Sequence, residues 1–120
     1  DYFENTDGIG VLSTSDSEGN VDSAIYARPH MMEDGTAALI MCDKLSHANL
    51  QSNYKACYLF KEAGAGYKGI RLYLKKIRED DSEEKVAELR RRYKNYSPPT
   101  EEKRFVVYFE IEKTRKLVGG

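Results

Sequence analysis

The sequence predicts a mainly β domain, a six-stranded antiparallel barrel with short helices at its ends. Apolar and polar residues alternate in several segments with the period of two that a half-buried strand shows, most regularly over residues 104–111. Turn-forming residues separate these segments, and the strand–helix–strand rhythm of a parallel sheet is missing from the pattern. The 120 residues suit one core, so we expect a single domain over residues 1–120.

The first three predicted strands are joined by hairpin turns. Residues 8–15 are rich in β-branched side chains and lead through the polar stretch 16–20 into an apolar strand at residues 21–32. Asp34-Gly35 then supplies the residues that a tight hairpin needs, and another apolar strand covers residues 36–42. We therefore expect these three strands to run consecutively antiparallel.

The middle of the chain predicts a short helix and two further strands. A polar corner, Asp43-Lys44, leads into the helix at residues 45–53. An apolar run at residues 55–62 predicts the fourth strand. From Tyr67 the pattern alternates and places Ile70, Leu72 and Leu74 on one face of the fifth strand.

The last third predicts a helix, a connector and the final strand. Ser82 is a good N-cap residue, and Val86, Leu89 and Tyr93 follow it at helical spacing. The basic residues Arg90, Arg91, Arg92 and Lys94 fit the outer face and last turn of that helix. Residues 96–100 hold two prolines and predict a connector, after which the sixth strand begins.

Composition excludes several classes of partner and suggests a compartment. Nineteen basic and twenty acidic residues give a net charge of -1, so no global field favours nucleic acid or an anionic membrane surface. No apolar run approaches the length of a membrane-spanning helix. Cys42 and Cys57 lie in apolar runs without metal-site spacing, which predicts buried free thiols in a reducing, cytoplasmic compartment. Residues 1–6 resemble a helix end, and the chain opens on Asp1, so we expect an N-terminal piece to have been removed.

The corner after the third strand is the candidate functional site. A strand that ends at a helix start leaves backbone N–H groups unpaired, an arrangement that binds phosphate and other anions. A phosphate-loop glycine motif, a paired-cysteine metal site and a nucleophile elbow are missing, and His30 and His47 are the only histidines. We therefore predict no metal site, nominate no catalytic side chain, and expect any chemistry to come from a bound cofactor.

These residues resemble the pyridoxamine 5'-phosphate oxidase-like FMN-binding split barrels, and the likeness covers nearly the whole chain. The similar features are the order of the elements, the segment Gly-Ile-Gly-Val-Leu-Ser-Thr-Ser before a turn, and the Asp-Gly hairpin before an apolar strand. A further similarity is the segment from His47 to Asn53, where the family commonly has an Asn-Leu pair, a polar residue and Asn-Pro.

The resemblance implies a split-barrel homodimer that holds one FMN per subunit at the dimer interface. In such proteins the second strand lines the flavin ring and ribityl chain, and the end of the third strand and the following helix start hold the phosphate. The second-strand positions are Ala24, Ile25, Tyr26 and Ala27, with Arg28 as a nearby cation. The phosphate positions are Met41, Cys42, Lys44, Ser46, His47 and Asn49.

This chain departs from the family pattern before the helix. Many members carry an Arg-Lys pair where this sequence has Leu45-Ser46, so the phosphate charge needs another cation: Lys44, His47, Arg28 or a residue of the second subunit. Asp43, as an N-cap, would consume the amides that a phosphate needs, unless it points away. The arginines and histidine of the true pyridoxine-oxidising enzymes have no clear counterparts in residues 113–120.

Three functions are compatible with these features. The first is an FMN-dependent oxidoreductase or flavin reductase, with a nicotinamide or protein electron donor and an unknown substrate. The second is a carrier of flavin, deazaflavin or haem without turnover, with His30 and His47 as the available haem ligands. The third is a structural dimeric barrel that lost its cofactor. In that case Tyr26 and Arg28 cover a dimer surface, and Ser46 and Asn49 make only local hydrogen bonds.

Overall fold

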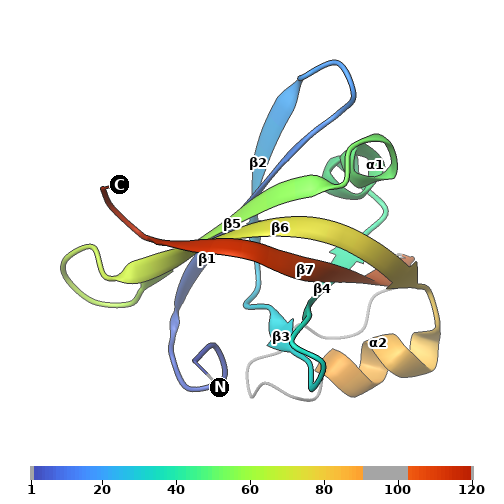
Figure 1. Cartoon of the computed structure of the whole chain (residues 1–120). Helices are drawn as coiled ribbons and strands as arrows, with labels where there is room; N and C mark the ends of the chain where they lie inside the picture. Colours follow the sequence, from blue (N-terminus) through green and yellow to red (C-terminus); the bar gives the residue numbers. More distant parts are fainter. Residues whose placement is uncertain (1, 91–102, 120) are drawn as a thin grey trace.

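One curled antiparallel sheet of seven strands and two short helices form the part of the chain that the computed structural model describes, residues 2–90 and 103–119 (Figure 1). This arrangement confirms the mainly β, antiparallel split-barrel fold class. The strands are β1 (Gly8–Ser15), β2 (Val21–Tyr26), β3 (His30–Met31), β4 (Ala37–Cys42), β5 (Lys55–Glu62), β6 (Gly69–Asp80) and β7 (Arg104–Lys116). The helices are α1 (Leu45–Ser52) and α2 (Glu83–Arg90).

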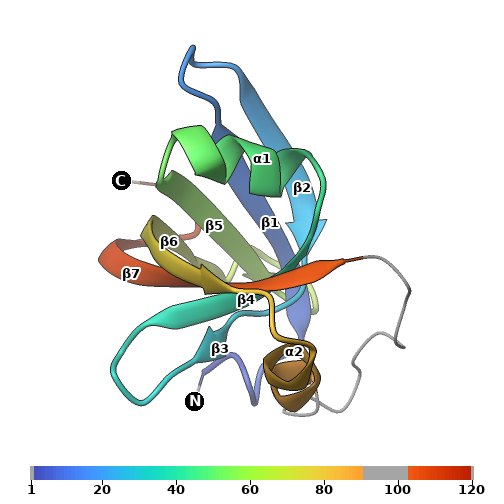
Figure 2. The same ribbon diagram turned by 90° about the vertical axis from the view of Figure 1, so that its right-hand side faces the viewer.

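The strands lie in the order β2-β1-β5-β6-β7-β4-β3, and each neighbouring pair is antiparallel. The two edge strands therefore come from the first third of the chain, while the middle of the sheet comes from later segments. Figure 2 shows the sheet curling into a partly closed barrel, with α1 across one end and α2 beside β4 and β7. The barrel is split because its edges, β2 and β3, are not paired with each other within the described chain.

The expected strand over residues 21–32 is wrong, because the chain breaks there into β2 and β3. Pro29 is buried in the break, and proline has no N–H group to donate to a ladder. The Tyr58 hydroxyl donates to the carbonyl oxygen of Ala27 at 3.1 Å and so helps to hold the turned backbone. The break adds a seventh strand, and β2 and β4 lie far apart in the sheet order instead of pairing.

Both predicted hairpins form. In the loop between β1 and β2, an Asp16 carboxylate oxygen accepts from the amides of Glu18 and Asn20, both at 2.9 Å. The Asp34-Gly35 turn joins β3 to β4: the Met32 amide donates to the carbonyl oxygen of Thr36 at 2.9 Å. The second hairpin is much shorter than expected, because β3 has only two residues.

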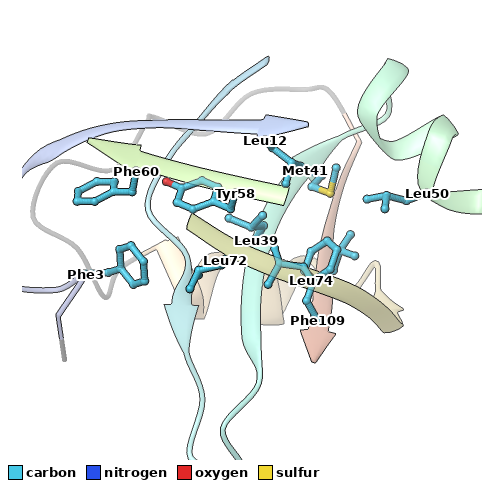
Figure 3. Packing of buried hydrophobic residues seen from close by; sticks show 11 residues of the cluster. Phe3, Leu12, Leu39, Met41, Leu50, Tyr58, Phe60, Leu72, Leu74 and Phe109 are labelled. Carbon is cyan, nitrogen blue, oxygen red and sulfur yellow. The ribbon is translucent and has the colours of Figure 1, made fainter. Parts of the chain in front are cut away.

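The main core fills the barrel interior (Figure 3). The predicted alternation is confirmed on β6 and β7, because Leu72 and Leu74 on β6 and Val107 and Phe109 on β7 are all buried in this cluster. Its remaining buried members are Phe3, Leu12, Leu39, Met41, Leu50, Tyr58 and Phe60. Gly10 has no room for a side chain, since a Cβ atom there would overlap the Tyr58 hydroxyl.

A second, smaller core lies on the outer face of β4 and β7, beneath α2. Val86 and Leu89 of α2 pack there with Val106 and Tyr108 of β7 and with Ala38. Ser82 precedes the helix as predicted: its hydroxyl accepts from the Lys85 amide at 3.3 Å. The expectations for Arg91, Arg92, Tyr93, Lys94 and the connector at 96–100 fall outside the described residues.

The N-terminal segment closes the barrel end opposite α1. Residues 2–5 form a turn. Phe3 is buried and meets the Phe60 ring edge-on, with 5.3 Å between ring centroids. The Tyr2 hydroxyl donates to Glu62 at 2.6 Å. The segment is therefore anchored to β5 by packing and by a hydrogen bond.

Candidate functional site

A cavity of about 540 Å³ lies in the split of the barrel, between β2 and β4. The curl of the sheet brings the inner face of β2 opposite the outer face of β4. Ala24 pairs with the core residue Leu12 and so faces inward, whereas Ile40 and Cys42 alternate with the core residues Leu39 and Met41 and so face outward. The lining comprises Gly8, Asp22, Ala24, Ile25, Tyr26, Ala27, Arg28, His30, Ile40, Cys42, Lys44, Leu45, Ser46, Arg90 and Arg104.

Eight of the eleven residues predicted to bind the cofactor line this cavity: Ala24, Ile25, Tyr26, Ala27, Arg28, Cys42, Lys44 and Ser46. The structure places the other three elsewhere. Met41 is fully buried in the barrel core, because it alternates with Cys42 on β4. The Asn49 amide group donates to the Thr14 hydroxyl at 3.0 Å and ties α1 to β1. His47 points away from the cavity into a network of its own.

The start of α1 carries no side-chain cap. Lys44 holds the N-cap position in an extended conformation, with φ -131° and ψ -164°, and the first turn holds no acidic residue. Asp43 therefore does not act as the N-cap, and its carboxylate lies 3.5 Å from Nδ1 of His47. The first-turn amides are not consumed by a side chain, so the helix start keeps its partial positive charge for another group.

Tyr26 on β2 and Ser46 in the first turn of α1 both line the cavity. Burial raises the pKa of Tyr26 above its ordinary value, and the influence of Ser46 opposes part of that rise. A hydroxyl group can donate one hydrogen bond, so each of these side chains is a candidate donor beside the uncapped amides.

His47 belongs to a charged network under α1. Its Nε2 lies 3.0 Å from a Glu79 carboxylate oxygen, and its ring stacks on Phe105 with centroids 3.9 Å apart. Lys76 and Gln51 donate to the other Glu79 oxygen at 2.6 and 3.1 Å. Burial alone would raise the pKa of Glu79, but the hydrogen bonds from Lys76, Gln51 and His47 outweigh it and bring this pKa to about 2. The network fixes α1 to β6 and β7.

Positive charge gathers around the cavity. Its lining includes the cationic side chains of Arg28, Lys44, Arg90 and Arg104 and a single carboxylate, Asp22. Arg28 is committed to the backbone: its Nη1 donates to the carbonyl oxygens of Phe3 and Thr6 at 2.9 and 2.8 Å. Its distance to Asp7 is 3.5 Å. Because opposite charges attract strongly in a partly dry cleft, such a lining favours an anionic ligand.

Sequence reasoning missed several lining residues, chiefly Asp22, Ile40, Arg90 and Arg104. The alternation of side chains along their strands could have identified Asp22 and Ile40 as lining residues. Arg104 is the partner of Cys42 in the β4–β7 ladder, a pairing between distant segments that local patterns do not reveal. Within the described ranges no group of three or more His, Cys, Asp or Glu side chains has metal-binding geometry. No helix of the described chain is long and apolar enough to cross a membrane.

Comparison with known proteins identifies the fold. An FMN-binding protein from Syntrophomonas wolfei subsp. wolfei superposes with a TM-score of 0.70 at 23% identity, over 98% of this chain and 78% of that protein. A pyridoxamine 5'-phosphate oxidase-like protein from Listeria innocua gives 0.62 at 16% identity, over 91% and 87% of the two chains. A haem-binding protein from Mycobacterium smegmatis gives 0.58 at 18% identity, over 96% and 50%.

The chain therefore has the split-barrel fold of the pyridoxamine 5'-phosphate oxidase-like proteins, which confirms the resemblance at the level of fold. No protein-family model matches the sequence, and no curated protein matches it significantly. This fold is shared by an FMN-binding and a haem-binding protein, so the fold alone does not define the ligand.

Proposed function

We propose that this protein binds FMN in the cavity between β2 and β4 and acts as an FMN-dependent redox protein. The observation that carries the proposal is the uncapped start of α1, which opens into a cationic cavity of about 540 Å³. This volume falls in the range of roughly 300–1,000 Å³ typical of small-molecule sites. A solved FMN-binding protein with the same fold supports the choice of cofactor.

The phosphate of FMN would lie at the start of α1. The first-turn amides, the hydroxyl groups of Ser46 and Tyr26, and Lys44 would donate to it, and charge-assisted hydrogen bonds of this kind are the strong ones. The ring would pack along the β2 side of the cavity, whose lining includes Ala24 and Ile25. The small Ala24 side chain leaves room there for a planar group.

Bound FMN supplies hydride and single-electron transfer, which this chain's own side chains cannot perform. The protein's part is to position the ring and to set the electrostatics around it. Half-buried Tyr26 and Cys42 line the cavity and restrict water, and the cationic lining favours an anionic ligand. The electron donor in this proposal is a nicotinamide or a partner protein.

The two histidines are not placed to hold haem as a pair. His30 lines the cavity and is 5% exposed, whereas His47 lies under α1, bonded to Glu79 and stacked on Phe105. A bis-histidine haem site would therefore require His47 to leave its network, and His30 is the one histidine in the cavity lining.

We further propose that the protein is a homodimer with the cofactor at the subunit interface. Ile25 lines the cavity, and its side chain belongs to the outer face of β2, where it is 65% exposed. Val21, 81% exposed, lies on the same outer face, and Val11 pairs directly with Ile25. An apolar sheet face at the mouth of a cavity is typical of a surface that a second subunit covers.

Titration with FMN tests the cofactor proposal directly. We expect the purified protein to quench flavin fluorescence at micromolar or lower FMN and to shift the visible flavin bands. Ala24→Phe should fill the ring side of the cavity and weaken binding at least about tenfold, since a well-packed site has no space for the added ring.

Ala65→Phe is the matched control for the FMN titration, because Ala65 is exposed in the β5–β6 loop and is not part of the cavity lining. This variant should bind FMN like the wild type. A wild-type protein that is colourless and leaves the flavin unquenched at micromolar FMN would rule out the proposed function.

A further inference from the structure

Arg104 lies beside the start of α1 although it comes from a distant part of the chain. It opens β7 and is the cross-strand partner of Cys42, the last residue of β4. The Lys44 amide donates to the Cys42 carbonyl oxygen at 2.9 Å, so the helix begins immediately beyond that pair. Side chains of directly opposed strand residues stand roughly 5 Å apart at Cβ, which puts the α1 start within reach of a long arginine side chain.

The side chain of Arg104 belongs to the cavity and not to the barrel core. Arg104 alternates with Phe105, which packs against the barrel core, so Arg104 is on the outer face of β7, as Cys42 is on the outer face of β4. Both residues line the cavity with Lys44 and Ser46. The guanidinium group and the helix amides therefore border the same space.

Arg104 also has an unmet hydrogen-bonding need. Its Nε is buried and has no hydrogen-bond partner, and within the described residues no carboxylate lies at ion-pair distance from its guanidinium. Its neighbour Lys103 pairs with Asp81 at 3.1 Å, and Arg28 is bonded to backbone carbonyls. A buried N–H of a charged group without an acceptor is costly, so an anionic ligand at this position would relieve an existing penalty.

We infer that Arg104 is the residue that makes this site selective for a phosphorylated flavin over the same flavin without phosphate. The inference rests on the proposed function and assigns to β7 the cation that the sequence lacks before α1. Arginine suits this role because its planar fork can donate two parallel hydrogen bonds to phosphate oxygens. Arg104 is thus a specificity-determining residue whose effect is confined to the phosphate end of the ligand.

The affinities of the wild type and of several variants for FMN and for riboflavin test this role. FMN and riboflavin differ only in the phosphate, so their affinity ratio isolates the phosphate contribution. We expect the wild type to prefer FMN, and Arg104→Gln to lower FMN affinity roughly 10- to 100-fold, the range for a charge-assisted hydrogen bond, while riboflavin affinity stays unchanged. Arg104→Lys keeps the charge but loses the fork, so it should retain an intermediate preference.

Arg78→Gln is the matched control, because it removes the same charge from a groove beside α2, where Arg78 lies 3.8 Å from the centre of the Tyr108 ring. At fixed salt it should leave the FMN-to-riboflavin ratio unchanged. Equal losses for FMN and riboflavin in Arg104→Gln, unchanged FMN affinity in that variant, or an equal effect of Arg78→Gln would each overturn the inference. Wild-type protein that binds neither ligand would instead overturn the proposed function, so the two failures are distinct.

Discussion

His47 illustrates, at the scale of single residues, how a side chain next to a binding corner can serve the helix and not the ligand. The resemblance to the split-barrel family placed it at the phosphate, one residue from Ser46. One helical step turns the side chain under α1, where the ring stacks on Phe105 and bonds to Glu79. Its contribution to the site is therefore indirect: it fixes the helix whose amides face the cavity.

Glu79 gives this network a measurable pH dependence. Its pKa is about 2 in the folded protein, against an ordinary value of 4.5. A carboxyl whose pKa is lower when folded stabilises the protein fully above its unfolded pKa and loses that effect as the pH falls toward the folded pKa. We expect the free energy of unfolding to fall between about pH 5 and pH 2, and Glu79→Gln to remove much of that slope.

Urea unfolding at a series of pH values, followed by far-ultraviolet circular dichroism, measures this effect. At pH 7 Glu79→Gln should cost about 2 kcal/mol, because hydrogen bonds to a charged group are lost, and the difference from wild type should shrink as the pH falls. Glu18→Gln, in the exposed β1–β2 loop, is the control and should keep the wild-type slope. A wild-type slope in Glu79→Gln would show that the network does not stabilise the fold.

At the scale of secondary-structure elements, the break between β2 and β3 shapes the site. The apolar run over residues 21–32 is continuous in sequence, yet the chain leaves one edge of the sheet at Tyr26 and joins the other edge at His30. Arg28 lies in this crossing and bonds to the N-terminal turn. Arg28 therefore connects three parts of the structure: the N-terminal turn, the segment between β2 and β3, and the cavity that its side chain lines.

Replacing Arg28 should destabilise these parts of the structure. Arg28→Gln removes two hydrogen bonds from a charged donor to backbone carbonyls, and the Arg28 side chain is only 17% exposed, so we expect a loss of about 2 kcal/mol in the free energy of unfolding. Asp7→Asn keeps both hydrogen bonds and removes only the ion pair between Arg28 and Asp7. Because the Asp7 side chain is 85% exposed, this change should lower the free energy of unfolding very little. Chemical denaturation checks both, and equal effects of the two variants would contradict this reading of Arg28.

The elements were largely predictable from the sequence, but the assembly of the site was not. Alternation identified β6 and β7, Asp34-Gly35 located a hairpin, and Ser82 marked the start of α2, because these signals are local. Pro29 is a local signal for the break that the apolar run over residues 21–32 masked, whereas the contacts of Arg28 and Tyr58 that hold the turned backbone are tertiary and not readable from the sequence. Arg104 was missed as a site residue because its place depends on the β4–β7 register, which no local pattern encodes.

At the scale of the whole molecule, the outer face of β1 and β2 is the surface that the proposed dimer would bury. Ile9 and Ile25 are 52% and 65% exposed there, and Ile25 also lines the cavity. Leaving such side chains in water costs free energy that a second subunit recovers. In this proposal, formation of the homodimer also completes the wall of the cofactor cavity.

Ile25→Glu tests the dimer. A charge at the centre of an apolar interface should shift the protein from dimer to monomer and weaken FMN binding at the same time, because burying an unpaired carboxylate is unfavourable. Light scattering coupled to size-exclusion chromatography gives the mass, and Tyr67→Glu is the control, since Tyr67 is 77% exposed in the β5–β6 loop. A monomeric wild type, or an Ile25→Glu dimer of wild-type stability, would contradict the proposed interface.

The gap between the unpaired edge strands β2 and β3 affects the stability of the barrel. Its two margins are the only places in the described sheet where a strand has one neighbour instead of two, so cooperative hydrogen bonding does not hold them together. A ligand bound in this gap contacts elements near both edges of the sheet, so its binding free energy adds to the free energy of unfolding of the barrel. The ligand thereby takes the place of the strand pairing that would otherwise close the barrel.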